Sequence, residues 1–497
     1  MTKSALVVGA GFGGIATALR LRALGLDVHV VERQESIGGR AQAFEVDGYR
    51  HDAGPTVITA PFLFDELFEL FGERREDHIE FRELTPWYRF IFPDGDHFDY
   101  GGTLEKTLAE IRRIEPKDQA GYESLVQHSK AMFDIGFSQL AHQPFHEIKT
   151  MAKQIPHLAR LRSDRSVWAM VCKHLSHDKL RQAFSIQPLL VGGSPFDTTS
   201  IYGLIHYLER AFGIFFAMGG TGALVEQLKQ LMLRQGITFQ TGTTVSEILT
   251  SQNKVFGVKL KSGEVVTADC VVFNGDPMYL YRELLPENKI PFTTRLKRDY
   301  SKLSMGLYVL FFGANKQYRD VAHHTIWMGQ RYKDLLDDIF HRQVLADDFS
   351  LYLHRPTATD SSFAPTGHDS FYVLAPVPHQ GGCIDWAVEE PKLRYRIIEA
   401  LDQTILPDLK AHIQAPFSMT PDHFAEDYLS YQGAGFSIAP LFTQSAWFRF
   451  HNKAEGFENL YLTGAGTHPG AGMPGVISSA KVVEQLVKET MVKRAFV

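Results

Sequence analysis

The sequence is poor in cysteine and has no long apolar run. Its three cysteines, Cys172, Cys270 and Cys383, lie far apart with no C-x-x-C pair, so a disulfide framework or a cysteine zinc site is not indicated and a reducing cytosol fits. No apolar run reaches the roughly 18 residues of a membrane-spanning helix. Arg20 and Arg22 interrupt the apolar N-terminus where a signal peptide would be uncharged, so secretion is not expected.

Excess positive charge is also lacking. Lysine and arginine total 51 against 57 acidic residues, a net charge of −6, which argues against a protein held on nucleic acid by a general basic field. The exception is 149–181, where eight basic residues face two aspartates, a local charge of +6. Apolar residues such as Trp168 interrupt these charges, which is typical either of a segment lying on an anionic membrane or of a solvated helix pair. We expect Pro156 to prevent one straight helix there.

Glycine is concentrated near the N-terminus. Residues 5–8 form a short apolar run, Gly9-Ala10-Gly11-Phe12-Gly13-Gly14 follows, and an apolar helical face begins at Ile15. A second strand, 26–31, ends at Glu32, eighteen residues after Gly14. This order of strand, glycine turn, helix, strand and acid is the dinucleotide-binding pattern, in which the helix N-terminus receives a pyrophosphate and the acid a ribose hydroxyl. An acid at this position disfavours a nucleotide with a 2′-phosphate.

Two segments beyond Glu32 add to the pattern. Arg33 is followed by Gly38-Gly39-Arg40, whose arginine could reach the pyrophosphate or remain an ordinary surface residue. Gly220-Thr221-Gly222 resembles another phosphate loop but lacks the third glycine, so a helix start is expected, followed by a hairpin around 261–264 and a buried strand at 271–273.

The region 291–421 contains strand-like runs with frequent aromatic and histidine residues. Loops at 323–327, 351–360 and 374–382 are plausible walls of a substrate cavity. His174-x-x-His177 and His323-His324 lack accompanying ligands, so no metal site is expected.

The C-terminal region carries a resemblance to a known family. The segments QSAWFRFHN (444–452) and NLYLTGAGTHPGAGMPGVISSAK (459–481), together with the N-terminal glycine turn and G-G-R, resemble the bacterial-type phytoene desaturases, flavoproteins of the amine oxidase superfamily. HHTIW, LYLHRPT and LAPVPH also match in order, so the likeness covers nearly the whole chain. Phe450 departs from the expected proline. Thr467 stands where many superfamily members carry an acid, and replacement of this acid is itself a feature of the carotene desaturases.

The resemblance implies non-covalently bound FAD, with one cofactor held by both glycine-rich ends of the chain. The helix beginning at Met473-Pro474-Gly475 would direct its N-terminus at the flavin N1–C2 edge, where charge collects on reduction. The predicted cofactor-binding residues are Gly9, Gly11, Phe12, Gly13, Gly14, Glu32, Arg33, Gly39, Arg40, Gly54, Pro55, Thr56, Val245, Asn274, Asp276, Gly466, Thr467, Met473, Gly475 and Val476. His468 is the candidate catalytic base, with a structural role as its alternative.

The implied reaction is desaturation of phytoene to lycopene, or of a related polyene, with a hydride passing from an allylic carbon to flavin N5. Alternatives are a C30 carotenoid desaturase, a carotenoid oxygenase-type relative, and a prenyl-binding carrier on the same scaffold without flavin catalysis. The expected partners are an apolar polyene, a membrane surface and oxygen or a quinone as electron acceptor, with no nucleic acid. The expected location is cytoplasmic, peripheral on the inner membrane.

The expected fold is α/β with three parts. A discontinuous Rossmann-like FAD-binding domain comprises 1–75, 215–290 and 422–497. A mixed-sheet substrate-binding domain comprises 76–130 and 291–421, and a helical, membrane-associating subdomain comprises 131–214.

Overall fold

A five-stranded parallel sheet brings three distant parts of the chain together. The computed structural model describes residues 3–495, without the side chains of 152, 155, 157, 158 and 493–495. The sheet has the order β19-β13-β1-β2-β9, and every neighbouring pair is parallel. Its strands are β1 (Ser4–Val8), β2 (Asp27–Val31), β9 (Thr238–Gln240), β13 (Cys270–Phe273) and β19 (Leu460–Leu462).

Both faces of this sheet are covered, which explains why β13 and β19 are apolar along their whole length. One face packs on α1 (Phe12–Ala23), α9 (Gly220–Arg234) and α16 (Met473–Ala495). The other packs on the antiparallel sheet β10-β11-β12, formed by Val245–Ser251, Lys254–Leu260 and Val265–Thr267. The predicted hairpin and the helix that begins at 220 are therefore confirmed.

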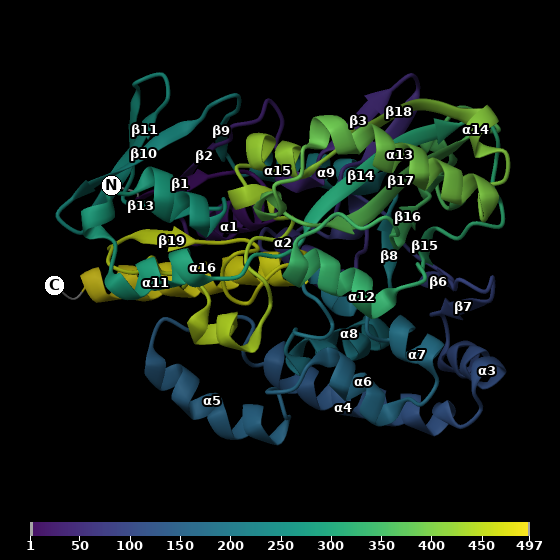
Figure 1. Ribbon diagram of the computed structural model, residues 1–497. Coiled ribbons are helices and arrows are strands. Elements are labelled where there is room, and N and C mark those ends of the chain that lie inside the picture. Colours follow the sequence, from purple (N-terminus) through teal and green to yellow (C-terminus); the bar gives the residue numbers. More distant parts are fainter. Residues whose placement is uncertain (1–2, 496–497) are drawn as a thin grey trace.

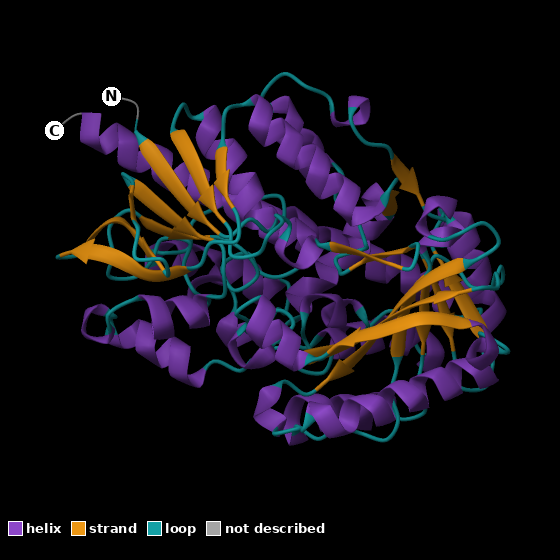
Figure 2. Cartoon of the chain, turned by 90° about the horizontal axis from the view of Figure 1, so that it is seen from above, coloured by secondary structure: helices purple, strands orange, loops and turns teal. Residues whose placement is uncertain are grey.

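A mixed sheet of seven strands stands beside the first, as Figure 2 shows from above. Its order is β18-β14-β17-β16-β15-β6-β7, and only the pair β15 and β6 is parallel. Its strands are β6 (Tyr88–Ile91), β7 (His97–Tyr100), β14 (Gly306–Ala314), β15 (His324–Trp327), β16 (Leu351–His354), β17 (Asp369–Val377) and β18 (Ile413–Met419). Helix α13 (Trp386–Gln403) covers one face, and the other contributes to a large apolar core shared with the helical region.

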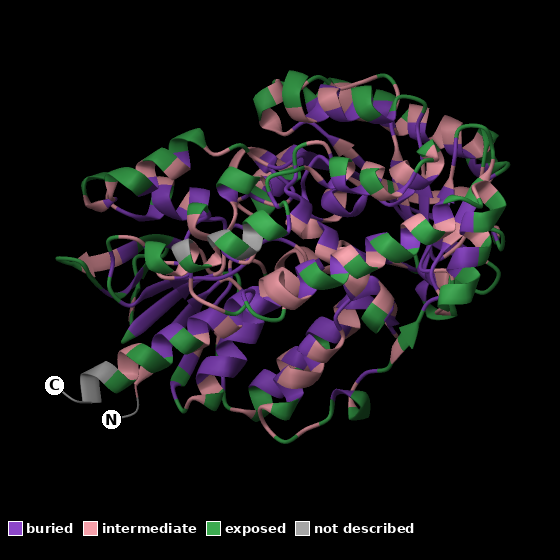
Figure 3. Cartoon of the chain, turned by 90° about the horizontal axis from the view of Figure 1, so that it is seen from below, coloured by how far each residue is buried: buried purple, intermediate pink, exposed green. Residues whose placement is uncertain are grey.

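The helical region lies beneath the sheets in Figure 1. It consists of α3 (Leu104–Ile114), α4 (Asp118–Gly136), α5 (Ile148–Arg160), α6 (Val167–His174), α7 (Asp178–Ala183) and α8 (Leu204–Phe212). The smaller elements are α2 (Phe62–Glu69), α10 (Pro277–Tyr279), α11 (Phe292–Tyr300), α12 (Tyr332–Asp337), α14 (Leu409–His412), α15 (Pro421–Asp427), the hairpin β3–β4 (Ala43–Val46 and Tyr49–Asp52), and the pair β5 (Phe81–Glu83) and β8 (Phe215–Ala217). Buried residues concentrate in the sheets and the inner faces of the helices (Figure 3).

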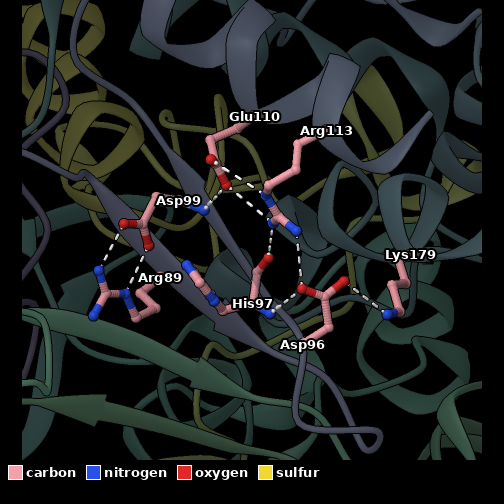
Figure 4. A network of polar contacts seen from close by, with 7 residues as sticks. All are labelled: Arg89, Asp96, His97, Asp99, Glu110, Arg113 and Lys179. Atoms are coloured by element: carbon pink, nitrogen blue, oxygen red, sulfur yellow. Dashed lines mark hydrogen bonds and ion pairs between the residues drawn. The ribbon is translucent and has the colours of Figure 1, made fainter. Parts of the chain in front are cut away.

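The basic stretch 149–181 divides into α5, α6 and α7. Pro156 lies inside α5, which continues to Arg160, so the breaks between the helices lie after it rather than at it. On α7, the Lys179 ammonium contacts Asp94 at 2.6 Å and Asp96 at 2.9 Å; Figure 4 shows the contact with Asp96. This charge is therefore compensated within the protein, and α5 carries the exposed basic residues at the start of the stretch.

The expected α/β fold, with a Rossmann-like sheet assembled from separate segments, is confirmed, while the domain boundaries stay predictions. Within residues 3–495, no helix combines the length and apolar character needed to cross a bilayer.

Candidate active site

The N-terminal glycine turn brings α1 very close to β1. β1 ends at Val8 and α1 begins at Phe12. Gly9 has φ +95°, in the left-handed region that favours glycine. A Cβ atom on Gly14 would lie 2.0 Å from the carbonyl oxygen of Gly9, so a side chain there would push the helix away from the turn.

The N-terminus of α1 is suited to an anion. Its cap residue, Gly11, makes no side-chain capping bond, and its first turn contains no acidic residue. The backbone N–H groups and partial positive charge at this end are therefore available to a phosphate.

Glu32 lies beside the same turn. One carboxylate oxygen accepts from the Ala10 N–H at 2.6 Å and the other from the Gln34 N–H at 2.8 Å. Burial raises the pKa of Glu32, and these two bonds oppose the shift. The carboxylate is thus held where the ribose of a dinucleotide on α1 is expected.

The C-terminal glycine loop packs directly against the N-terminal turn through Asn274, which follows β13. Thr463 donates to Asn274 Oδ1 at 3.1 Å. A Cβ on Gly13 would lie 2.4 Å from that oxygen and 3.3 Å from the Gly464 nitrogen. The two glycine-rich segments, far apart in sequence, therefore form one cradle rather than two separate sites.

The N-terminus of α16 meets this cradle. A Cβ on Gly475 would lie 2.5 Å from the Gly470 carbonyl oxygen, and Val476 Cγ1 lies 3.2 Å from the Cβ position of Gly13. The first turn of α16 contains no acidic residue. A second helix N-terminus is thus directed to the same place as the first.

Three predicted charged residues hold the neighbouring segment 427–437. Arg33 donates to a carbonyl oxygen at its start at 2.6 Å, and Arg40 to one near its end at 2.5 Å. Asp276 accepts from a backbone N–H and a serine hydroxyl of this segment. Burial lowers the pKa of Arg40. Contacts of these residues with the cofactor stay predictions.

The remaining predicted residues fall in three places. Phe12 and Met473 are buried in the core under the parallel sheet, and Val245 in the core on its opposite side. A Cβ on Gly39 would lie 3.1 Å from Gly11 Cα, and one on Gly466 2.4 Å from a proline ring carbon. Gly54, Pro55 and Thr56 line a cavity next to the cradle.

The cradle fits FAD in its chemistry. The N-termini of α1 and α16 carry no acidic residue in their first turns, which suits the pyrophosphate and the flavin edge that becomes negative on reduction. The buried Glu32 carboxylate suits a ribose, and the glycine surfaces leave room for close backbone approach.

An apolar cavity of about 360 Å³ begins at this cradle. Gly54–Thr56 and Met473–Gly475 line its cradle end. Phe442 also lines the cavity and is itself 40% exposed. Its other walls are largely aliphatic and include Leu140, Leu189, Leu208, Met305, Leu307, Ile326, Leu336, Leu351 and Leu374. An interior of this kind suits a hydrocarbon.

His468 lines the same cavity and is buried. Its Nε2 lies 2.9 Å from the Leu140 carbonyl oxygen, an acceptor, so Nε2 carries the hydrogen. Nδ1 has no hydrogen-bond partner within the described part of the chain. Burial lowers the pKa of His468 to about 4. A neutral ring whose Nδ1 is unpaired is compatible with the predicted base, but the low pKa makes His468 a weak base. The hydroxyl of the neighbouring Thr467 donates to the Gly464 carbonyl oxygen at 3.0 Å.

Arg449 was not singled out from the sequence. It is 1% exposed and donates to the carbonyl oxygens of Thr467 and Ala465 at 3.0 and 2.7 Å, and to two carbonyls of the preceding segment. Burial lowers the pKa of Arg449. The guanidinium therefore fixes the C-terminal glycine loop. An arginine between two aromatic residues in QSAWFRFHN was the available signal.

Glu209 was also missed. It is fully buried on α8 and lines the cavity. Ile205 lies four residues before Glu209, Leu208 one residue before it, and Phe212 three residues after it. Glu209 therefore occupies the apolar face of the helix. An acid at an apolar position of a helical pattern was the signal that could have found it.

The His323–His324 pair gains a third histidine in the fold. His324 on β15 pairs with His354 on β16, and His354 Nε2 lies 3.0 Å from His323 Nε2. All three are buried and offer ligand atoms within 4.8 Å of one another. The sequence could not reveal a partner across a strand pair. The expectation of no metal site stays a prediction, and this cluster is where a metal would be sought.

Comparisons with known proteins identify the family of the chain. The family model for flavin-containing amine oxidoreductases matches residues 12–483. The chain is 44% identical over 491 residues to the lycopene-forming phytoene desaturase of Pantoea ananas, covering 99% of this chain and all of that protein. It is 40% identical to the neurosporene-forming phytoene desaturase of Rhodobacter capsulatus, covering 98% and 94% of the two chains.

Solved structures support the fold. A crystallised oxidoreductase from Methanosarcina mazei superposes with a TM-score of 0.65 at 15% identity, covering 97% of this chain and 100% of that one. With a family match over most of its length and relatives above 40% identity, the chain belongs to the flavin-containing amine oxidoreductases and is an FAD-dependent oxidoreductase of the phytoene desaturase kind.

Proposed function

We propose that this enzyme converts phytoene to lycopene, or a related polyene to a more conjugated one, by successive desaturations. The observation that carries this proposal is the largely aliphatic cavity that begins at the dinucleotide cradle. Bound FAD supplies the hydride acceptor, at flavin N5, for hydrogen leaving an allylic carbon. The residues of the chain orient a substrate that offers no polar group and exclude water from it.

The cradle residues and the cavity have separate tasks. The N-termini of α1 and α16 stabilise negative charge on the cofactor, and Arg449 holds the loop between β19 and α16 in place. The aliphatic walls align the hydrocarbon by contact alone, so its position depends on the shape of the cavity.

We propose that the substrate enters from a membrane surface through the end of the cavity at Phe442. Around this end, Ile148 of α5 is 63% exposed and Phe448 is 38% exposed. Lys149 and Lys153, on α5, are exposed basic residues suited to anionic headgroups. The proposal narrows the membrane-docking surface to α5 and its neighbours, because Lys179 of α7 is paired within the protein.

A vesicle-binding measurement tests this surface. Reversing Lys149 and Lys153 to Glu should weaken binding to anionic vesicles by roughly tenfold or more, at about 1 kcal/mol per charge removed. Reversing two exposed lysines of the distant β11 hairpin, Lys254 and Lys259, is the matched control. Equal losses in the two variants would contradict the placement.

The substrate length, the number of double bonds and the electron acceptor are parts of the same proposal. A C40 substrate is favoured over C30 by the 44% identity to a lycopene-forming desaturase. Oxygen or a quinone is the proposed acceptor. A prenyl-binding carrier would need no flavin, and the intact cradle argues against it.

Expression in cells that make phytoene, followed by chromatography of the pigments, tests the proposed function. We expect phytoene to disappear and lycopene or another conjugated polyene to accumulate. A Gly14→Val variant, which should not hold FAD, is the control. Unchanged phytoene with the wild-type protein, expressed and loaded with flavin, would contradict the proposal.

A further inference from the structure

Glu209 is a carboxyl group in a cavity built for hydrocarbon. It is 0% exposed, and it lines the same cavity as the cradle residues Met473–Gly475. Its Oε1 accepts one long hydrogen bond, 3.3 Å, from the Tyr88 hydroxyl. Its Oε2 is buried and has no partner of normal hydrogen-bond geometry among the described residues. Hydrogen bonds with Tyr88, Gln187 and Tyr100 only partly offset the cost of burying this acid, which favours a functional reason for it.

The groups facing Glu209 come from every neighbouring element. They are Tyr88 of β6, Tyr100 of β7, Tyr122 of α4, Gln187, and Arg210 on the same helix. Arg210 donates to the Gly102 carbonyl oxygen and the Thr107 hydroxyl at 2.7 and 2.8 Å, and its charge only partly offsets the effect of burial on the pKa of Glu209. Burial therefore dominates and raises the pKa of Glu209 to about 8.

The reaction requires a proton acceptor. Each new double bond removes two hydrogens from adjacent carbons: a hydride passes to the oxidised flavin, and a proton must leave the neighbouring carbon. Four further titratable residues on the walls are poorly matched, because burial lowers the pKa of His468 to about 4 and raises the pKa of Tyr332, Tyr352 and Tyr372 above the usual tyrosine range. A base works best with a pKa near the working pH.

We infer that Glu209 accepts this proton at Oε2 in each desaturation, an inference that rests on the proposed function. The C–H electron pair becomes the second bond of the new C=C, the flavin is reduced by the hydride, and the carboxylate becomes a carboxylic acid. The acid returns the proton to solvent between turnovers. Glu209 is thus a catalytic residue, and the neutral His468 is the rival base on the same cavity.

The test is anaerobic flavin reduction by phytoene in vesicles, followed by stopped-flow absorbance from pH 6 to 9.5. In the wild type, the rate should rise with pH through about 8, because only the ionised carboxylate accepts a proton. E209Q preserves the shape of the side chain and should slow reduction about 100-fold or more, abolishing this rise while FAD content is retained. Y88F removes a donor that lowers the pKa of Glu209, so the rise should move to higher pH.

Thermal unfolding gives a readout independent of turnover. A buried acid with a raised pKa stabilises the fold when protonated, so the melting temperature of the wild type should fall relative to E209Q as pH increases from 4.5 to 8. Reduction in E209Q at a wild-type rate, or with the same pH dependence, would overturn the role of Glu209 alone. No flavin reduction in the wild type at any pH would contradict the proposed function and this role together.

Discussion

Replacing Gly14 by alanine should weaken FAD binding because it forces α1 away from the glycine turn. The new Cβ would lie 2.0 Å from the Gly9 carbonyl oxygen and 3.1 Å from Asn274 Nδ2. Ordinary carbon–oxygen contact requires more than about 3 Å, so the helix must shift by about 1 Å. The free protein relieves the clash by this shift, whereas FAD binding needs the close approach restored. Overpacking of about 1–3 kcal/mol then corresponds to a roughly 5- to 150-fold higher Kd.

Fluorescence titration of flavin-free protein with FAD measures this change. Gly25→Ala is the matched control at the other end of α1, because Gly25 has φ +85° and no atom within 4 Å of its Cβ position. It should cost about 1 kcal/mol of folding stability while leaving the FAD Kd unchanged. A wild-type Kd for Gly14→Ala, or the same increase in both variants, would refute the reasoning.

Three further variants test the C-terminal half of the site. Gly475→Asp should lower the flavin reduction potential or the FAD affinity. It adds negative charge at the N-terminus of α16, and its Cβ would lie 2.5 Å from the Gly470 carbonyl oxygen. An unchanged potential and affinity would contradict the placement of this helix. His468→Gln should reduce the loss of stability on acidification. The neutral His468 ring stabilises the fold fully above pH 6.5, and this contribution, up to about 3.4 kcal/mol, is lost as pH falls toward 4. Urea unfolding at several pH values measures the loss. The same pH dependence in the wild type and in His468→Gln would contradict this role. In Arg449→Met, four carbonyl oxygens lose their donor, so the free energy of unfolding should fall by about 3 kcal/mol or more; a wild-type value in urea unfolding would contradict a fixing role.

The cofactor-binding half of the fold was predictable because its signals are local. The spacing from Gly9 to Glu32 reflects a strand, a turn and a helix that follow one another along the chain. The start of α16 at Met473 and the hairpin of β11 and β12 were predictable for the same reason. The expectation that both glycine segments hold one cofactor came from the family resemblance rather than from periodicity. Their contact through Asn274 was not predicted, because it depends on the parallel alignment of β1, β13 and β19.

The residues that were missed act across the fold. Arg449 gained its role from carbonyl oxygens that the loop after β19 presents, and His354 met its partners across a strand pair. The role of Glu209 depends on the cavity, whose walls come from segments that are far apart in the sequence. Charge counting treats all lysines of the stretch 149–181 alike. It could not show that Lys179 is paired with Asp94 and Asp96 on the β6–β7 turn, which is distant in sequence.

Anaerobic mixing of the purified, FAD-loaded enzyme with phytoene in vesicles tests the central claim most directly, because it joins the cradle, the cavity and the substrate in one observation. The flavin absorbance near 450 nm should bleach about in step with the appearance of conjugated polyene, and admission of oxygen or a quinone should restore it. A flavin that stays oxidised in the presence of bound phytoene would contradict the account.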